Sequence, residues 1–198
     1  MLNKIAGTLI PIGGNEDKGS HENDGIDFIT EGILSHIVHQ CGGNNAKILV
    51  VPTASSIPDE VGENYLDAFK MLGCKNVSVL DIRDSIQCEN ADILKKVSKS
   101  DGVLFSGGNQ SRIVDIIGQT SLHKLLAHKY INNQFVIAGT SAGAMSMVSE
   151  MIMGGSSEDC LIKGAVKMRE GMNYISDLII DTHFIKRGRF GRLAEAVA

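Results

Sequence analysis

The chain contains 198 residues, of which 43% are hydrophobic and 21% are charged, and its formal net charge is -4. This length corresponds to one domain with a full hydrophobic core. With 19 basic against 23 acidic residues, the chain lacks the broad positive charge typical of nucleic-acid binding. No apolar run approaches the ~20 residues of a membrane span, and the N-terminal stretch lacks a signal-peptide cleavage pattern. We therefore expect a single cytoplasmic domain over residues 1–198, without nucleic-acid or membrane partners.

Short apolar runs alternate along the chain with stretches of helical spacing. In chain order we predict strand Gly7–Ile12, helix Asp24–Gln40, strand Ala46–Val51, helix Asp59–Leu72, strand Asn76–Asp81, helix Ala91–Val97, strand Gly102–Phe105, helices Asn109–Ile117 and Ser121–Tyr130, strand Phe135–Ala138 and strand Leu178–Ile180. Most of the strands are continuously apolar, which is typical of a parallel sheet that is buried on both faces. The order predicts an α/β layered fold with right-handed crossovers.

The last residues of the chain, Arg192–Ala198, have a helical pattern without a capping glycine or asparagine. We interpret this as a domain that is shortened at its C-terminus. Comparison of the intact mass with the full reading frame would test that interpretation.

The four cysteines offer no metal or redox motif. None of them forms a Cys-x-x-Cys pair, so zinc-ribbon and thioredoxin chemistry have no support. They are Cys41, Cys74, Cys88 and Cys160. Isolated thiols of this kind are typical of buried side chains in a reducing compartment. We expect neither a metal nor a cofactor.

The motif Gly139-x-Ser141-x-Gly143 follows the predicted strand Phe135–Ala138 and precedes a run that can start a helix. This strand-turn-helix context is that of a nucleophile elbow. A sharp turn holds the serine in a strained conformation, and small flanking residues let strand and helix approach closely. The hydroxyl then projects at a helix N-terminus, where N–H groups favour negative charge. Ser141 is the candidate nucleophile; the alternative is a tight turn with a capping serine.

Two adjacent glycines, Gly107 and Gly108, follow the predicted strand Gly102–Phe105. They permit a bent backbone with free N–H groups, as an oxyanion hole requires. The next residues, Asn109 and Gln110, are expected to face the crevice in which α/β folds bind ligands. The alternative is an ordinary turn between a strand and a helix.

A similar segment, Gly13-Gly14-Asn15, follows the first predicted strand. We expect it to shape the neighbouring rim of the site.

His183 follows the predicted strand Leu178–Ile180, and a histidine at a strand end can act as general base for a serine on a neighbouring strand. A third group must orient such a base. The candidates are Glu158 and Asp159, since Asp181 would project away from the neighbouring strand. The alternative is a structural histidine. The remaining histidines fall in loops or helical patterns and are expected to be solvated or satisfied: His21, His36, His39, His123 and His128.

Positive charge is concentrated beside this histidine in an otherwise acidic chain, at Lys186, Arg187, Arg189 and Arg192. Arginines recognise carboxylates through paired planar hydrogen bonds, so the cluster indicates an acidic substrate. The alternative is the solvated start of a helix.

Together, the stretches Gly107–Gln110, Gly139–Ala144 and Asp181–Arg192 resemble the cyanophycinases, serine exopeptidases of the aspartyl dipeptidase-like peptidase family S51. The resemblance runs from Gly7 to the end of the chain. It implies a three-layer α/β/α sandwich with a central, mostly parallel sheet, of the class I glutamine amidotransferase-like type, in a cytoplasmic homodimer. The implied activity is hydrolysis of cyanophycin, a polyaspartate whose side-chain carboxylates carry arginine, to β-aspartyl-arginine dipeptides.

The resemblance also implies roles for individual residues. Ser141 would be the nucleophile and His183 the base, with Asp159, or else Glu158, orienting the histidine. The N–H groups of Gly108 and Ala142 would stabilise the oxyanion. The substrate pocket would contain Asn109, Gln110, Asp181, Thr182, Arg187, Arg189 and Arg192.

Two features depart from the family pattern. Thr182 stands where the family often has glutamine, which shortens a pocket side chain, and the family continues well beyond position 198. Two other functions therefore fit the same residues: a peptidase of short α- or β-aspartyl peptides, or a non-catalytic ligand-binding member of the fold. A glutamine amidotransferase would need cysteine at position 141.

Overall fold

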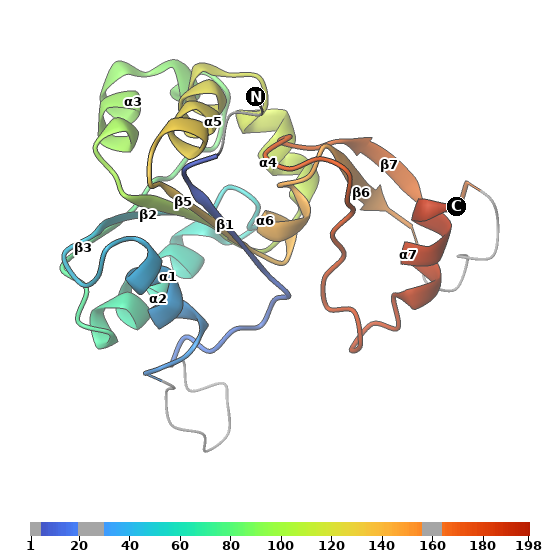
Figure 1. Cartoon of the computed structure of the whole chain (residues 1–198), viewed down its shortest axis with the longest axis horizontal. Helices are drawn as coiled ribbons and strands as arrows, with labels where there is room; N and C mark the ends of the chain where they lie inside the picture. Colours follow the sequence, from blue (N-terminus) through green and yellow to red (C-terminus); the bar gives the residue numbers. More distant parts are fainter. Residues whose placement is uncertain (1–4, 20–29, 156–163) are drawn as a thin grey trace.

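The computed structural model describes residues 5–19, 30–155 and 164–198. A five-stranded parallel sheet lies at the centre, with strand order β1-β5-β4-β2-β3 (Figure 1). Its strands are β1 (Thr8–Ile12), β2 (Lys47–Val51), β3 (Asn76–Val79), β4 (Gly102–Phe105) and β5 (Val136–Thr140). Because β4 and β5 are neighbours, the turns that follow them lie at the same edge of the sheet. One of these turns carries Gly107 and the other Ser141.

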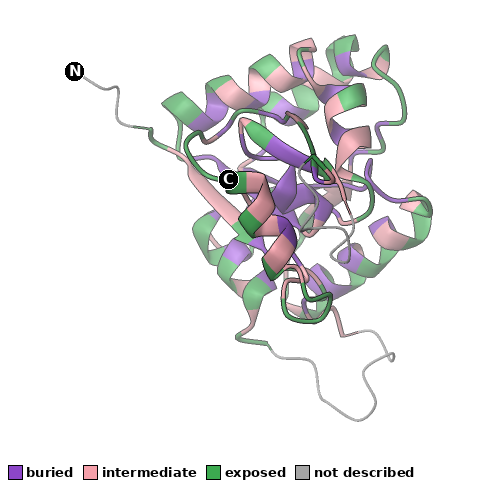
Figure 2. Ribbon diagram, turned by 90° about the vertical axis from the view of Figure 1, so that its right-hand side faces the viewer, coloured by how far each residue is buried: buried purple, intermediate pink, exposed green. Residues whose placement is uncertain are grey.

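Helices cover both faces of the sheet. One face packs against α1 (Ile33–Gln40) and α2 (Pro58–Met71), and the other packs against α3 (Ala91–Ser98), α4 (Gln110–Ile117) and α5 (Ser121–Asn132). Successive strand residues point to opposite faces, so Leu49 joins one core cluster while Ile48 and Val50 join the other. Figure 2 shows the buried residues gathered in the sheet and on the inner sides of the helices. The predicted three-layer α/β/α sandwich is confirmed.

Capping residues in the sequence explain where several of the helices begin. Asn90, Asn109 and Thr120 each precede a helix, and each side chain accepts a hydrogen bond from an N–H group of the first turn. Such a cap satisfies a donor that has no partner inside the helix. Helix α2 begins with Pro58, whose fixed φ suits the first helical position.

A smaller C-terminal lobe packs beside the sheet, at the right of Figure 1. It consists of the antiparallel strands β6 (Glu150–Gly154) and β7 (Lys167–Glu170), the irregular segment 171–189 and helix α7 (Phe190–Val197). Its own small core contains Met145 of the short helix α6 (Ala142–Met145), Ile152 and Val166, against which Ile179, Ile180 and Leu193 pack. The lobe is also tied to α4, because Arg169 forms an ion pair with Asp115 at 2.7 Å.

Most predicted elements are confirmed to within two residues, but the predicted strand Leu178–Ile180 is wrong. In the structure this segment has no strand partner. Leu178 is exposed, and the next two side chains contribute to the core of the C-terminal lobe instead. The hairpin of β6 and β7 was not predicted. Helix α1 begins at Ile33 in the described chain, while positions 24–29 of the predicted helix lie outside the described residues. No helix in the described ranges combines the length and apolar character of a membrane span.

Candidate active site

Ser141 occupies a sharp turn between β5 and α6, with φ 51° and ψ -111°. A positive φ is unusual for a residue with a side chain and stores backbone strain. The surrounding structure holds the turn in place, since the Ser141 N–H donates to the carbonyl oxygen of Ile12 at 3.0 Å. The predicted elbow geometry is confirmed.

The glycines on either side of the serine are required by close packing. A Cβ on Gly139 would lie 2.5 Å from the carbonyl carbon of Gly143, and a Cβ on Gly143 would overlap the carbonyl oxygen of Phe105. Because both neighbours are backbone atoms, they cannot move aside as a flexible side chain could. The Gly-x-Ser-x-Gly spacing thus brings β5, β4 and α6 together beneath the serine.

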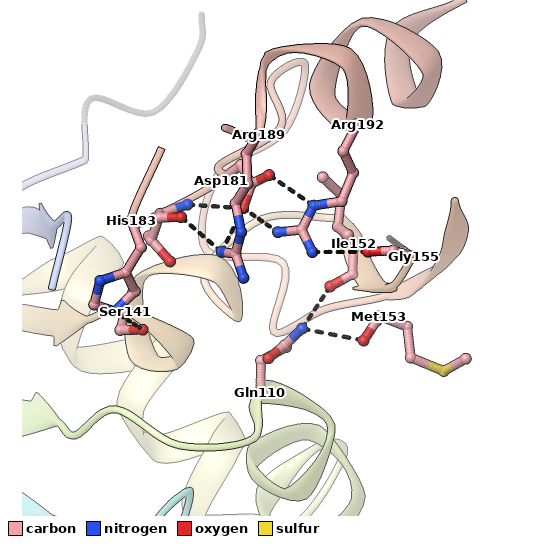
Figure 3. Close-up of polar contacts among 10 residues, drawn as sticks. Gln110, Ser141, Ile152, Met153, Gly155, Asp181, His183, Arg189 and Arg192 are labelled. Atoms are coloured by element: carbon pink, nitrogen blue, oxygen red, sulfur yellow. Dashed lines mark hydrogen bonds and ion pairs between the residues drawn. The ribbon is translucent and has the colours of Figure 1, made fainter. Parts of the chain in front are cut away.

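The His183 ring lies against this turn. Its Nε2 atom is 3.0 Å from the Oγ atom of Ser141 (Figure 3), which is within reach for proton transfer. The His183 backbone is also left-handed, with φ 51°, and its N–H donates to the carbonyl oxygen of Gly13 at 2.9 Å. The structure therefore brings together the two residues that the sequence nominated as nucleophile and base.

The loop after β1, at Gly13 and Gly14, packs against this imidazole. Gly14 has φ +101°, and a Cβ at this position would lie 2.5 Å from the Nε2 atom of His183. We expected this loop to shape the rim; instead it touches the base directly. The pattern of two glycines after an apolar strand, shared with Gly107 and Gly108, was the sequence signal for this role.

The surroundings of His183 favour its neutral form. Partial burial lowers the pKa of His183, and the positive charges of Arg187, Arg189 and Lys186 lower it further, while Glu16 acts in the opposite direction. A neutral imidazole can accept the proton of the Ser141 hydroxyl. The electrostatics therefore suit a general base.

Asp181 and two arginines hold the turn that carries the histidine. The Asp181 carboxylate is fully buried and accepts hydrogen bonds from Arg189 Nη1 at 3.0 Å and from Arg192 Nε at 2.9 Å (Figure 3). Arg189 Nη1 also donates to the carbonyl oxygen of Thr182 at 2.6 Å. These two guanidinium groups thus bind a carboxylate of the chain itself, on the residues directly before His183.

Thr182 is almost fully buried between these groups, at 2% exposure. Its N–H donates to Asp181 Oδ1 at 2.8 Å, while its hydroxyl has no hydrogen-bond partner among the described residues. The side chain fills the protein interior beside the histidine.

A cleft of about 340 Å³ opens in front of the serine and the histidine. Of the three predicted pocket arginines, Arg187 is the one that lines this cleft, and Lys18 lies on it as well. Glu16, which forms an ion pair with Lys18, lines the cleft too. The described lining thus has two cationic groups and one carboxylate, and this excess of positive charge suits an anionic ligand.

One of the two oxyanion candidates, Gly108, lies at this cleft. Gly108 lines it, with φ +141°, and a Cβ there would overlap the carbonyl oxygen of Ala54. The N–H groups of Gly108 and Ala142 donate to no other described residue. The Gly108 N–H can therefore serve an oxygen atom bound in the cleft, while Ala142 directly follows the nucleophile and is buried.

The polar residues after Gly108 make contacts within the protein. The Asn109 side chain caps α4 by accepting from the Ser111 N–H at 2.9 Å. Gln110 Nε2 donates to the carbonyl oxygens of Ile152 at 2.8 Å and Met153 at 3.2 Å (Figure 3). Gln110 thereby links α4 to β6, so it supports the C-terminal lobe next to the cleft.

The two acids expected to orient His183, Glu158 and Asp159, lie outside the described residues. Within the described ranges, no carboxylate forms a hydrogen bond with His183. Sequence reasoning also missed Glu16, whose buried side chain lies on the same cleft. Its position directly after Gly14 and Asn15, beyond the end of an apolar strand, was the available signal.

Residues 26–198 match the family model of peptidase family S51. The chain belongs to peptidase family S51. The resemblance on which the sequence analysis relied is thereby confirmed, and with it membership in a serine-type peptidase family.

Curated relatives agree with this assignment. The chain is 34% identical to a cyanophycinase from Geminocystis herdmanii, over 100% of this chain and 70% of that relative. It is also 34% identical to a cyanophycinase from Trichormus variabilis, over 96% of this chain and 61% of that relative. A crystal structure of a peptidase from an acI-B1 Actinobacterium has the same fold, with a TM-score of 0.70, 19% identity, and coverage of 96% of this chain and 72% of that one. The chain thus spans about two thirds of the length of the proteins it matches.

Proposed function

We propose that this chain is a serine peptidase that hydrolyses cyanophycin and releases β-aspartyl-arginine dipeptides. The observation that carries the proposal is the 3.0 Å contact between Ser141 Oγ and His183 Nε2 on a strained elbow facing a cleft. Curated cyanophycinases that are 32–34% identical to it support the choice of substrate.

In the first step, His183 Nε2 accepts the Ser141 proton while Oγ bonds to the carbonyl carbon of a backbone peptide bond between aspartyl residues. The carbonyl oxygen becomes an oxyanion, to which the N–H groups of Gly108 and Ala142 donate. In other enzymes, removal of one such donor raises the activation barrier by about 2.7–4 kcal/mol. His183 then protonates the leaving nitrogen as the C–N bond breaks.

In the second step, water replaces the leaving amine. His183 accepts a proton from the water, whose oxygen attacks the acyl carbon, and Ser141 regains its proton as the ester bond breaks. The side-chain bond to arginine stays intact in the product. Arg187, which lines the cleft, supplies positive charge for a free carboxylate of the substrate, which in this polymer is the α-carboxylate of an arginine group or of the chain end.

The direct test is incubation of the protein with purified cyanophycin and mass analysis of the products. We expect β-aspartyl-arginine from the wild type and a rate lower by more than about 10⁴-fold from Ser141→Ala, as for other serine peptidases that lose the nucleophile. A parallel panel of short α- and β-aspartyl peptides measures the preferred length. If only the short peptides are cleaved, they and not the polymer are the substrate. If neither the polymer nor the peptides are cleaved, the proposed function is contradicted.

A further inference from the structure

Glu16 is a buried acidic residue at the proposed active site to which the proposed reaction gives no role. Its side chain is 1% exposed, and it lines the cleft together with Ser141 and His183. A buried carboxylate is costly unless hydrogen bonds and positive charge compensate for its lost hydration. Its contacts therefore indicate what it does.

The carboxylate joins three separate parts of the fold. Thr140 Oγ1 at the end of β5 donates to Oε2 at 2.5 Å, and the hydroxyl of Tyr65 from α2 donates to Oε1. Lys18 Nζ forms an ion pair with Oε1 at 3.2 Å. Both carboxylate oxygens thus have partners within the protein, so the group is built into the fold rather than presented to a ligand.

The contact with Thr140 acts directly on the nucleophile. Thr140 is the residue before Ser141, and it pairs in the sheet with Ile12, whose carbonyl oxygen accepts from the Ser141 N–H. A strained turn persists only where its surroundings fix it. Glu16 fixes the side chain of Thr140, and the Ile12 carbonyl fixes the backbone of Ser141.

Glu16 also counters the charges around the base. Glu16 lines the same cleft as His183 and comes two residues after Gly14, which lies against the imidazole. The charged groups that act on the pKa of His183 are Arg187, Arg189 and Lys186, which are positive, and Glu16, which is negative. Protonation of His183 during catalysis places a further positive charge in this surrounding. A negative charge nearby stabilises that state.

We propose, as a step that rests on the proposed function, that Glu16 is a positioning residue: it holds Thr140 beneath the nucleophile and balances the positive charge that His183 gains during the reaction. Tyr65 and Lys18 in turn hold Glu16.

The key experiment compares Glu16→Gln with two variants that keep the carboxylate, Tyr65→Phe and Thr140→Val. Two quantities are measured: kcat and KM for cyanophycin, and the pKa of His183 from an NMR titration. For Glu16→Gln we expect kcat to fall by about tenfold to hundredfold, the effect of losing charged hydrogen bonds, with an unchanged KM and a lower His183 pKa. The other two variants should lower kcat by less and leave the His183 pKa unchanged.

Thr140→Ser is the matched control, because it restores the hydroxyl that Thr140→Val removes, and it should recover most of kcat. An unchanged kcat in Thr140→Val would overturn the positioning role even if Glu16→Gln did not fold. An unchanged His183 pKa in folded Glu16→Gln would overturn the charge-balancing role. If the wild type cleaved no aspartyl substrate, the proposed function would fail, whereas the NMR titration would still decide whether Glu16 acts on His183.

Discussion

The nucleophile and the base of this site are held by different kinds of interaction. The parallel sheet fixes Ser141 through its backbone, by the hydrogen bond to Ile12 and by glycine contacts too close for any side chain. The C-terminal lobe fixes His183 largely through ion pairs. Asp181, two residues before the histidine, binds Arg189 and Arg192, which follow the histidine in the sequence. Added side chains should therefore disturb the serine, and altered charges should disturb the histidine.

This difference follows from what each region can bury. The sheet has two helical layers and an extensive core, so its turns are set by packing. The C-terminal lobe has a small core and a long irregular segment, 171–189. Buried ion pairs hold this segment in place instead. Such a pair stabilises the fold only while both partners are present, because one partner alone is an uncompensated buried charge.

Asp181→Asn is the largest expected change, because it breaks the ion pairs that hold the base. It leaves two largely buried guanidinium groups without a carboxylate, so we expect a loss of about 3–5 kcal/mol in the free energy of unfolding. Urea unfolding of the variant and the wild type measures this loss of free energy. The matched control is Asp115→Asn, which removes an exposed ion pair with Arg169 and should cost less than about 1 kcal/mol. Equal losses in the two variants would show that the buried cluster has no special role.

Gly14→Ala tests the contact between the two regions. The added Cβ would lie 2.5 Å from His183 Nε2 and would require an L-residue at φ +101°. A displaced imidazole should lower kcat by about 10²-fold, the usual cost of a misplacement near 1 Å. Gly13→Ala is the control, since a Cβ at Gly13 meets no atom within 4 Å. Similar activity of the two variants would contradict the close packing of Gly14 against the His183 imidazole.

Arg187→Ala sharpens the account of the charges. In the wild type, kcat/KM should rise with pH as His183 loses its proton, with a midpoint below the ordinary histidine pKa of about 6.5, because burial and then Arg187 lower the pKa of His183. Removal of Arg187 raises that pKa, so the rising limb moves to higher pH. Lys186→Ala should move it in the same direction by less. A shift to lower pH in Arg187→Ala would refute this assignment of charges.

Asn109→Ala should have the smallest effect. Its side chain caps α4, so its loss should cost about 1 kcal/mol of stability, measured as a thermal or urea midpoint. Asn90→Ala, which removes the equivalent cap of α3, provides the comparison, and Asn109→Ser should restore the cap. We expect KM to be unchanged in Asn109→Ala. A raised KM in Asn109→Ser, whose cap is intact, would instead assign Asn109 to the substrate.

The parts of the structure that could be predicted are those set by neighbouring residues. The elbow at Ser141 depends on glycines two positions away. Continuous apolar runs predicted the inner strands β2, β4 and β5, which are buried on both faces, and short apolar or β-branched runs also located the less buried edge strands β1 and β3. The segment Leu178–Ile180 has the same apolar character but packs only through side chains, and the sequence pattern cannot distinguish these two cases.

Which side chains meet inside the protein was the main omission. The arginine cluster was interpreted as a site for an acidic substrate, and its charge pattern could not show that Arg189 and Arg192 bind Asp181 of the same chain. In the same way, Glu16 meets Thr140 only because β1 and β5 are neighbours in the sheet. This second contact depends on strand order, which local patterns do not encode.

The central claim is that Ser141 and His183 react as a nucleophile and its base. A fluorophosphonate that labels activated serines measures this directly, with the labelled residue identified by mass spectrometry of the digested protein. We expect one label per chain, on Ser141, no label in Ser141→Ala, and a labelling rate lower by about 10²–10⁴-fold in His183→Ala, the usual contribution of a general base. A wild-type protein that stays unlabelled, or a labelling rate that is the same without His183, would contradict the account.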